Sequence, residues 1–248
     1  MIGAIFFIIG AMFGSLANVC IYRMPKNKSI VFNRSACPYC RRTIAWYYNI
    51  PIVSFLLLKG KSHCCKKKIN PQYLLVELLT AVLFYLNVLL FPINQAILLS
   101  GITFFLIVIF YIDLKHKIIF DIFSYLLLVS GLLINFYPKL NPFSISVFNS
   151  FLSAMISMLF FLLIRYLFKK IKKKEGMGLG DTKLIAGLSA WSGFESFLYI
   201  LTVSSLIGIL YFLTFPKSKR GKKDIYIPSG SCLSFAFMIL LYFNSSLL

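Results

Sequence analysis

The sequence predicts an all-α protein, a polytopic integral membrane helical bundle of about eight transmembrane helices with a cytoplasmic loop subdomain between helices 1 and 2. Its 248 residues are 59% hydrophobic and 13% charged, and the mean hydropathy is +0.85. A soluble domain carries roughly 25% charged residues, so this chain lacks the charge to cover a water-facing surface. Its basic residues also cluster between long apolar runs, which is typical of a multi-pass membrane protein.

Eight apolar runs define the expected spans. A helix needs about 20 apolar residues to cross a bilayer, with about 17 as the practical minimum. The run 180–193 is short, so we expect it to be tilted or to continue into the next run after a bend near Gly193. In the first run, the small residues Gly10 and Gly14 allow close contact with another helix, but they equally suit a lipid-facing helix. The expected spans are 2–22, 72–91, 96–112, 119–137, 146–168, 180–193, 196–215 and 229–247.

Lysine and arginine set the orientation. Of the 26 basic residues, 24 lie in four segments, and eleven of these are in the loop between the first two spans. Loops rich in Lys and Arg stay in the cytoplasm, so these four segments are predicted to be cytoplasmic and both termini to lie outside. The segments are 23–71, 113–118, 169–183 and 216–224.

Two aspartates, Asp113 and Asp181, adjoin apolar runs at this cytoplasmic face. An ionisable group at membrane depth is energetically expensive and usually functional. Two carboxylates facing each other suit acid–base chemistry on a water molecule, so we predict that both are catalytic. The alternative makes Asp113 an interfacial residue and Asp121 a cap or first-turn residue of the helix that follows it.

The glycines of Gly176-Met-Gly-Leu-Gly-Asp181 form a second candidate site. Each glycine costs about 1 kcal/mol in a helix interior, and a stretch of this kind lets another backbone approach closely. We therefore expect Gly176, Gly178 and Gly180 to bind an extended substrate peptide beside Asp181. The alternative is a flexible loop that ends in an N-cap aspartate.

Four cysteines in the segment 23–71 form a third candidate site. Clustered cysteines in a reducing compartment indicate metal ligands before disulfides, and Cys37-Pro-Tyr-Cys40 has the spacing of a zinc-binding turn. Adjacent cysteines rarely both reach one ion, so we expect Cys65 to act with either Cys64 or His63. Unliganded thiols are the alternative.

Glu77 lies early in the second span. An unpaired acid there must face a polar partner or a wet cavity. Glu77 is therefore a candidate residue of a second site, and a partner in the basic loop is an alternative.

With these motifs the chain resembles the bacterial prepilin peptidases, also called type IV leader peptidases, over nearly its whole length. The most specific match is the run Gly176-Met-Gly-Leu-Gly-Asp-Thr-Lys-Leu184. Three departures are that Ser62 stands where the family commonly has a cysteine, Phe120 where it commonly has a proline, and Ser229 where it commonly has a larger residue. The other matching stretches are Gly14-Ser-Leu-Ala-Asn-Val-Cys-Ile-Tyr-Arg-Met-Pro25, Cys37-Pro-Tyr-Cys40, Asn49-Ile-Pro51, Val76-Glu-Leu-Leu-Thr-Ala81, Asp113 with Asp121, and Ile227-Pro-Ser-Gly230.

The resemblance implies a GxGD aspartic peptidase of the bacterial cytoplasmic (inner) membrane, with Asp113 and Asp181 as its catalytic pair. Such enzymes cleave the basic leader from type IV prepilins or from secretion or competence pseudopilins at the cytoplasmic face. Many also methylate the new N-terminus with S-adenosylmethionine, for which Glu77 is a candidate contact. The family's four-cysteine zinc loop matches Cys37, Cys40, Cys64 and Cys65, with His63 as a substitute ligand. The expected domains are the first helix 1–22, the basic cysteine loop 23–71 and the peptidase core 72–248.

Other classes of protein share some of these features. A transporter or channel could use Asp113, Asp181 and Glu77 as an ion relay, but the cysteine loop has no role in it. Intramembrane peptidases of the presenilin kind place a tyrosine before the first aspartate, where this chain has Ile112. Membrane lipids explain the basic loop more simply than nucleic acid does, so no nucleic-acid partner is expected.

Overall fold

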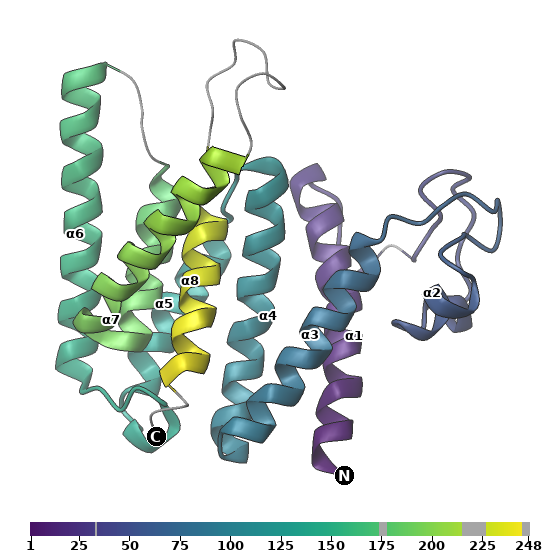
Figure 1. Cartoon of the computed structure of the whole chain (residues 1–248), viewed down its shortest axis with the longest axis horizontal. Helices are drawn as coiled ribbons and strands as arrows, with labels where there is room; N and C mark the ends of the chain where they lie inside the picture. The colour runs from purple at the N-terminus through teal and green to yellow at the C-terminus, as the bar shows by residue number, and fades with distance from the viewer. Residues whose placement is uncertain (33, 174–177, 215–226, 245–248) are drawn as a thin grey trace. The chain divides into compact units, whose positions relative to one another are not determined.

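A computed structural model describes residues 1–32, 34–173, 178–214 and 227–244, and these residues form a helical protein without strands (Figure 1). The expected all-α membrane fold is confirmed. Five helices, α1, α3, α4, α6 and α7, are long and apolar enough to cross a membrane, and α5 and α8 are shorter apolar helices. The helices are α1 (Ile2–Arg23), α2 (Val53–Leu57), α3 (Gln72–Leu90), α4 (Ile93–His116), α5 (Asp121–Ile134), α6 (Val147–Lys172), α7 (Leu179–Thr214) and α8 (Ser229–Asn244).

The helix bounds follow the expected spans with three differences. Helix α4 continues past Ile112 to His116, so Asp113 lies in its last turn instead of in the following loop. The run 119–137 forms a shorter helix, α5, that starts at Asp121. The loop 23–71 contains the helix α2 and the 3-10 turns η1 (Met24–Lys26) and η2 (Trp46–Asn49), which we did not expect from the sequence.

The chain forms two compact units, residues 1–108 and 109–248. In the first unit, α1 packs closely on α3. A Cβ atom on Gly14 would lie 2.6 Å from the Cα of Glu77, and one on Gly10 would lie 2.8 Å from the Cα of Ala81. Larger residues at these positions would force the two backbones apart, so the small-residue spacing in α1 supports helix contact.

In the second unit, α7 reverses direction at Gly193. This residue has φ 85° and ψ 179°, a conformation that essentially only glycine adopts. Asp181 and Gly208 both lie near the start of α8, since Ser229 bonds Asp181 and a Cβ on Gly208 would lie 3.6 Å from Ile227. A straight helix would separate residues 181 and 208 by about 40 Å. The expected bend near Gly193 is therefore a turn between two antiparallel arms.

Side chains from neighbouring elements satisfy the carbonyl groups at this reversal. The last four carbonyls of a helix have no partner within it. Around Gly193 they accept hydrogen bonds from four polar residues of α6 and of the segment between α5 and α6, which fixes the first arm of α7 and therefore Asp181. The bonds run from Ser153 to Ser189 (2.8 Å), from Ser150 and Asn135 to Ala190 (2.6 and 3.1 Å), and from Asn141 to Trp191 (2.9 Å).

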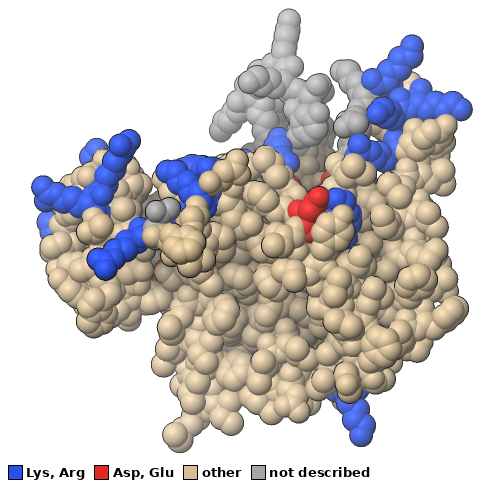
Figure 2. Space-filling model, turned by 180° about the vertical axis from the view of Figure 1, so that it is seen from behind, with Lys and Arg blue, Asp and Glu red and all other residues tan. Residues whose placement is uncertain are grey.

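The charged side chains lie mainly at helix ends. Figure 2 shows Lys and Arg side chains mainly along the top of the view, with a broad surface without charge below them. Within the second unit, Lys115 and Lys117 adjoin the end of α4, three lysines end α6, and Lys183 lies in the first turns of α7. Lys139 lies in η3 (Pro138–Leu140), beyond the opposite end of α5. The basic residues of this unit thus gather mainly at the end that holds Asp113 and Asp181.

Candidate active site

Asp113 and Asp181 both bond the first turn of α8. Asp113 comes from the last turn of α4, and Asp181 is the third residue of α7. The Oδ2 atom of Asp113 accepts a hydrogen bond from the N–H of Ser231 (2.7 Å) and contacts its hydroxyl (3.1 Å), while the hydroxyl of Ser229 donates to Oδ1 of Asp181 (2.8 Å). Two acids separated by 68 positions in the sequence thus meet residues two positions apart on one helical turn.

Both carboxyl groups are buried, with Asp113 only 4% exposed and Asp181 only 6% exposed. The first N–H groups of a helix have no partner within it, and its N-terminus favours negative charge. The start of α8 therefore supplies both the donors and the positive potential that two buried acids need.

Ser229 and Ser231 are the residues that sequence reasoning missed. The sequence shows Ser229 as a departure from a familiar motif, but we attached no consequence to it. Its hydroxyl bonds the carboxylate of Asp181, and the hydroxyl of Ser231 also lies 2.8 Å from the carbonyl of Phe110 in α4. Only the pairing of two polar residues around Gly230, directly before an apolar run, could have signalled a polar helix start.

Glycines let the backbone pass close to these acids. A Cβ atom on Gly230 would lie 3.1 Å from Cγ of Asp113 and 2.6 Å from Cδ1 of Ile119. A Cβ on Gly178 would lie 3.5 Å from Oδ2 of Asp181, and one on Gly180 would lie 3.0 Å from Cβ of Ile119. The neighbour of Gly180 is therefore Ile119 of this same chain. Binding of a substrate by these glycines stays a prediction. Gly176 lies outside the described residues.

The structure does not place Asp121 with the other two acids. Asp121 is the first residue of α5, and its carboxylate pairs with the ammonium group of Lys183 at 2.7 Å. The Asp121 side chain is 56% exposed, and an exposed ion pair contributes about 0–1 kcal/mol. Asp121 therefore joins the starts of α5 and α7 and fits the first-turn role considered above.

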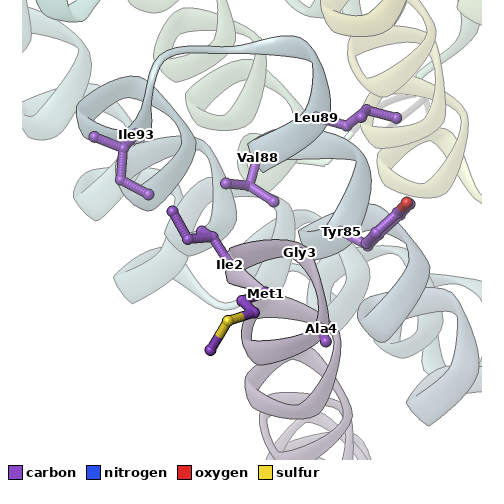
Figure 3. A pocket seen from close by; sticks show the side chains of 8 residues that line it. All are labelled: Met1, Ile2, Gly3, Ala4, Tyr85, Val88, Leu89 and Ile93. Carbon is purple, nitrogen blue, oxygen red and sulfur yellow. The ribbon is translucent and has the colours of Figure 1, made fainter.

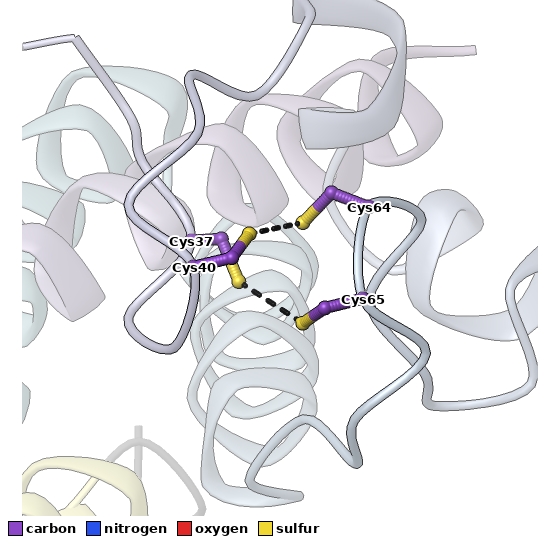
Figure 4. Close-up of side chains that lie close together, drawn as sticks. All are labelled: Cys37, Cys40, Cys64 and Cys65. Carbon is purple, nitrogen blue, oxygen red and sulfur yellow. Dashed lines mark hydrogen bonds between the residues drawn. The ribbon is translucent and has the colours of Figure 1, made fainter.

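The second candidate site is a cluster of four cysteines in the loop 23–71 (Figure 4). The sulfur atoms of Cys37, Cys40, Cys64 and Cys65 all lie within 4.8 Å of one another. Both adjacent cysteines reach the cluster, as in the alternative that pairs Cys65 with Cys64. The ring of His63 instead stacks on Tyr48, with centroids 4.0 Å apart.

Two similar turns build the cysteine cluster. Residues 36–43 and 61–68 each close with an antiparallel β-bridge, and each has a residue with positive φ directly after its last cysteine. Ser62 occupies the place of Cys37, so Cys64 supplies the fourth sulfur atom from within the second turn. The N–H···O=C bonds, all 2.9 Å, run from Arg41 to Cys37 and from Cys37 to Arg42 in the first turn, and from Lys66 to Ser62 and from Ser62 to Lys67 in the second.

The distances between the sulfur atoms allow a test of the fit to zinc. With Zn–S bonds of about 2.3 Å, a tetrahedral site has S···S distances of about 3.8 Å. The Cys37 and Cys65 sulfurs are 3.7 Å apart, whereas those of Cys40 and Cys64 are 3.0 Å apart and would have to separate slightly. Four thiols within this range fit one tetrahedral ion.

The environment makes these thiols differ in acidity. Burial of the Cys37 thiol opposes its ionisation, yet its pKa is lowered to about 6, because the backbone N–H groups of Cys40 and Tyr39 and neighbouring thiols donate to the thiolate. The hydroxyl of Ser62 lowers the pKa of Cys65, while the hydrogen bond between Cys40 and Cys64 raises the pKa of Cys64 to about 12. A bound cation would have to displace the proton from Cys64.

Glu77 has a partner in the basic loop, as one of our alternatives proposed. Its Oε2 atom accepts a hydrogen bond from the N–H of Ile52 at 2.8 Å, and the side chain is 9% exposed. Glu77 thus ties the loop 23–71 to α3. Its contact with a cofactor stays a prediction.

An apolar hollow lies between the first turn of α1 and the region from the end of α3 to the start of α4 (Figure 3). Tyr85, Val88 and Ile93 are among the residues that line it. None of the candidate acids or cysteines borders this hollow, so we assign no chemistry to it.

Comparison with known proteins identifies two family models that together cover most of the chain. Residues 8–91 match the model described as bacterial peptidase A24 N-terminal domain, and residues 100–213 match the type IV leader peptidase family. No solved structure matches the chain closely enough to be counted as similar.

Similar curated proteins come from several bacteria. A prepilin leader peptidase/N-methyltransferase of Klebsiella pneumoniae is 36% identical over 82% of this chain and 90% of its own length. A type 4 prepilin-like proteins leader peptide-processing enzyme of Escherichia coli O78:H11 is 31% identical over 95% of this chain and 92% of its own length. A prepilin leader peptidase/N-methyltransferase of Vibrio cholerae is 30% identical over 96% of this chain and 95% of its own length.

Proposed function

The chain belongs to the type IV leader peptidase family, and on that premise we propose that it cleaves the basic leader from type IV prepilins or pseudopilins. We place the reaction at the cytoplasmic face of the bacterial inner membrane. One observation carries the catalytic part of this proposal, namely that two buried acids, Asp113 and Asp181, bond the same turn of α8. The basic residues near them support the cytoplasmic placement.

The two acids would activate one water molecule. Two close carboxyl groups share a proton more easily than both ionise. The ionised group takes a proton from water while the water oxygen bonds the peptide carbonyl carbon, and the other acid donates its proton to the carbonyl oxygen. When the C–N bond breaks, the first acid passes its proton to the leaving nitrogen, and the second acid takes back a proton from a hydroxyl of the tetrahedral intermediate, so both acids return to their starting states. The products are a leader with a new carboxylate and a pilin with a new amino terminus.

The test is cleavage of a prepilin by purified protein in detergent, scored by gel shift and product mass. We expect that Asp113→Asn and Asp181→Asn each abolish cleavage, because each variant lacks one of the two acids that the proton transfers need. Asp121→Asn is the matched control and should keep most activity, since its exposed carboxylate pairs with Lys183. Substantial cleavage by either of the first two variants would rule out the proposed pair, and ion flux into liposomes without cleavage would favour a transporter.

Methylation of the new N-terminus is the second proposed activity, and the names of the relatives support it. S-adenosylmethionine would supply the methyl group. Glu77 fits a cofactor contact only in part, because its Oε2 atom already bonds Ile52, so we derive no step through the cofactor. We expect label from S-adenosylmethionine on the processed pilin. A processed but unlabelled product under saturating cofactor would leave a peptidase alone.

We also propose that the cysteine cluster holds one structural zinc ion. Four thiolates would close its coordination and leave no position for a reacting water. The metal content of purified protein should be near one zinc per chain and should fall in Cys64→Ser. Cys20→Ser is the matched control because this thiol lies in α1, outside the cluster. Zinc-free protein, or equal zinc in both variants, would contradict the assignment.

A further inference from the structure

We propose that the segment from Trp46 to Leu58, called here the 46–58 segment, inserts into the cytoplasmic interface of the bilayer and binds anionic phospholipid there. It would hold the adjoining cysteine cluster against the membrane. The inference depends on the membrane location of the helices and not on the proposed chemistry. Four observations carry it: exposed apolar side chains, the depth of an anchoring bond, the backbone at that bond, and the charge of the loop.

The apolar side chains of this segment lack cover within the described protein. Trp46 is 79% exposed, Leu57 is 77% exposed, and Leu56 and Tyr47 are also more than half exposed. An apolar patch of this kind usually marks a surface for a membrane or a partner. Tryptophan and tyrosine are enriched where the bilayer meets water, which favours the membrane as the partner.

An anchoring bond sets the depth of the segment. The N–H of Ile52 bonds Glu77, which is the sixth residue of α3. At 1.5 Å per residue, Glu77 lies about 7.5 Å along the axis from the first residue of that helix. In the view of Figure 1, α2 lies level with the first half of α3 and not beyond its start. Interfacial helices bury their apolar face about 5–10 Å below the membrane surface, so the depths agree.

The backbone at Ile52 is held in an unusual form. It has φ 63° and ψ −55°, and the N–H of Val53 bonds the carbonyl of Pro51 at 2.6 Å. This is a strained γ-turn, and positive φ is rare for a β-branched residue. Such strain persists only where the surrounding structure enforces it. The bond to Glu77 enforces it here, directly before the following helix, α2.

The charge of the loop selects anionic lipid over the peptide substrate. The loop 23–71 has eleven basic residues and no acidic one. A lysine or arginine near an anionic membrane gains about 1 kcal/mol, whereas a basic leader peptide would be repelled. The stacking of Tyr48 on His63 joins the segment to the second turn of the cysteine cluster, so insertion would fix the depth of that cluster.

Tryptophan fluorescence can test the depth directly. The chain has two tryptophans, and the second, Trp191, is buried. The full-length protein is placed in phosphatidylcholine–phosphatidylglycerol vesicles, with or without brominated acyl chains, and the spectrum of Trp46→Phe is subtracted to isolate Trp46. We expect brominated lipid to remove the Trp46 signal and aqueous iodide to leave it. Quenching by iodide alone, or by neither agent because protein covers the ring, would overturn the proposal.

A matched pair of variants in the same loop sharpens the test. Leu57→Asp should shift the Trp46 emission to longer wavelength and open it to iodide, because a charge opposes insertion. Val31→Asp, at another highly exposed apolar position outside the segment, should leave the signal unchanged. Equal effects of both variants would contradict a specific insertion. Since the readout needs no catalysis, parallel cleavage assays separate failure of this inference from failure of the proposed function.

Discussion

Removal of the Ser229 hydroxyl should change the orientation of the Asp181 side chain while the acid itself is kept. This hydroxyl donates to Oδ1 of Asp181 at 2.8 Å, and the carboxyl group is only 6% exposed. In Ser229→Ala the carboxyl group of Asp181 remains but loses its bond to α8. We therefore expect Asp181 to turn away from its reactive orientation, with no change at Asp113, whose bonds come from Ser231.

The size of the effect follows from the bond. A hydrogen bond to a charged group contributes about 1.5–3 kcal/mol. If the whole amount is lost at the transition state, kcat falls by about 10- to 150-fold. The KM for a prepilin should change little, because the Ser229 hydroxyl bonds the acid and acts through its orientation. An effect through folding alone would instead lower the amount of active enzyme and the melting temperature.

The assay is steady-state cleavage of a prepilin in detergent, with thermal stability measured on the same samples. Ser229→Thr keeps a hydroxyl and should restore most of kcat. Ser234→Ala is the matched control, since its hydroxyl is buried in the same helix and has no hydrogen-bond partner among the described residues. Wild-type kcat in Ser229→Ala, or an equal loss in Ser234→Ala, would refute the positioning role.

Three further predictions concern backbone contacts. Gly230→Ala would place a methyl group 3.1 Å from Cγ of Asp113, so kcat should fall by at least tenfold, the equivalent of about 1.4 kcal/mol of misplacement; unchanged kcat would show that this turn yields freely. Gly193→Ala should lower the free energy of unfolding by about 1–3 kcal/mol because of its φ of 85°, measured by denaturant titration in detergent; equal stability would mean that the reversal can relax. Glu77→Ala removes the acceptor for Ile52, so limited proteolysis should cut the 46–58 segment faster than in wild type; an unchanged cutting rate would argue against the anchor.

The sequence located the helices well because membrane spans depend on local composition. A run of apolar residues is favourable as a helix in lipid whatever its neighbours are, and the observed bounds mostly lie within a few residues of the expected ones. The bend at Gly193 was also visible, since glycine interrupts an otherwise continuous run. The helix α2 was not foreseen, because five residues carry too little periodic signal and their placement depends on a bond to Glu77.

The candidate site could likewise be predicted from the sequence only in part. The type and position of Asp113 and Asp181 were enough to predict an acid pair at one face, because unpaired acids at membrane depth are costly. Their common support on α8 was not predictable, since no sequence rule relates residue 113 to 231 or 181 to 229. The cysteines show a similar limit. Their spacing indicated a metal site, but only the folded turns show that Cys64 and not His63 joins the cluster.

By itself, the sequence determined that this protein is a membrane bundle with basic residues and two acids at one face, because hydrophobicity and charge act residue by residue. The tertiary structure alone decided which polar groups meet. Ser229, Ser231 and Glu77 gain their roles only when segments distant in sequence pack together, because a hydrogen bond depends on separations of about 3 Å that composition cannot encode.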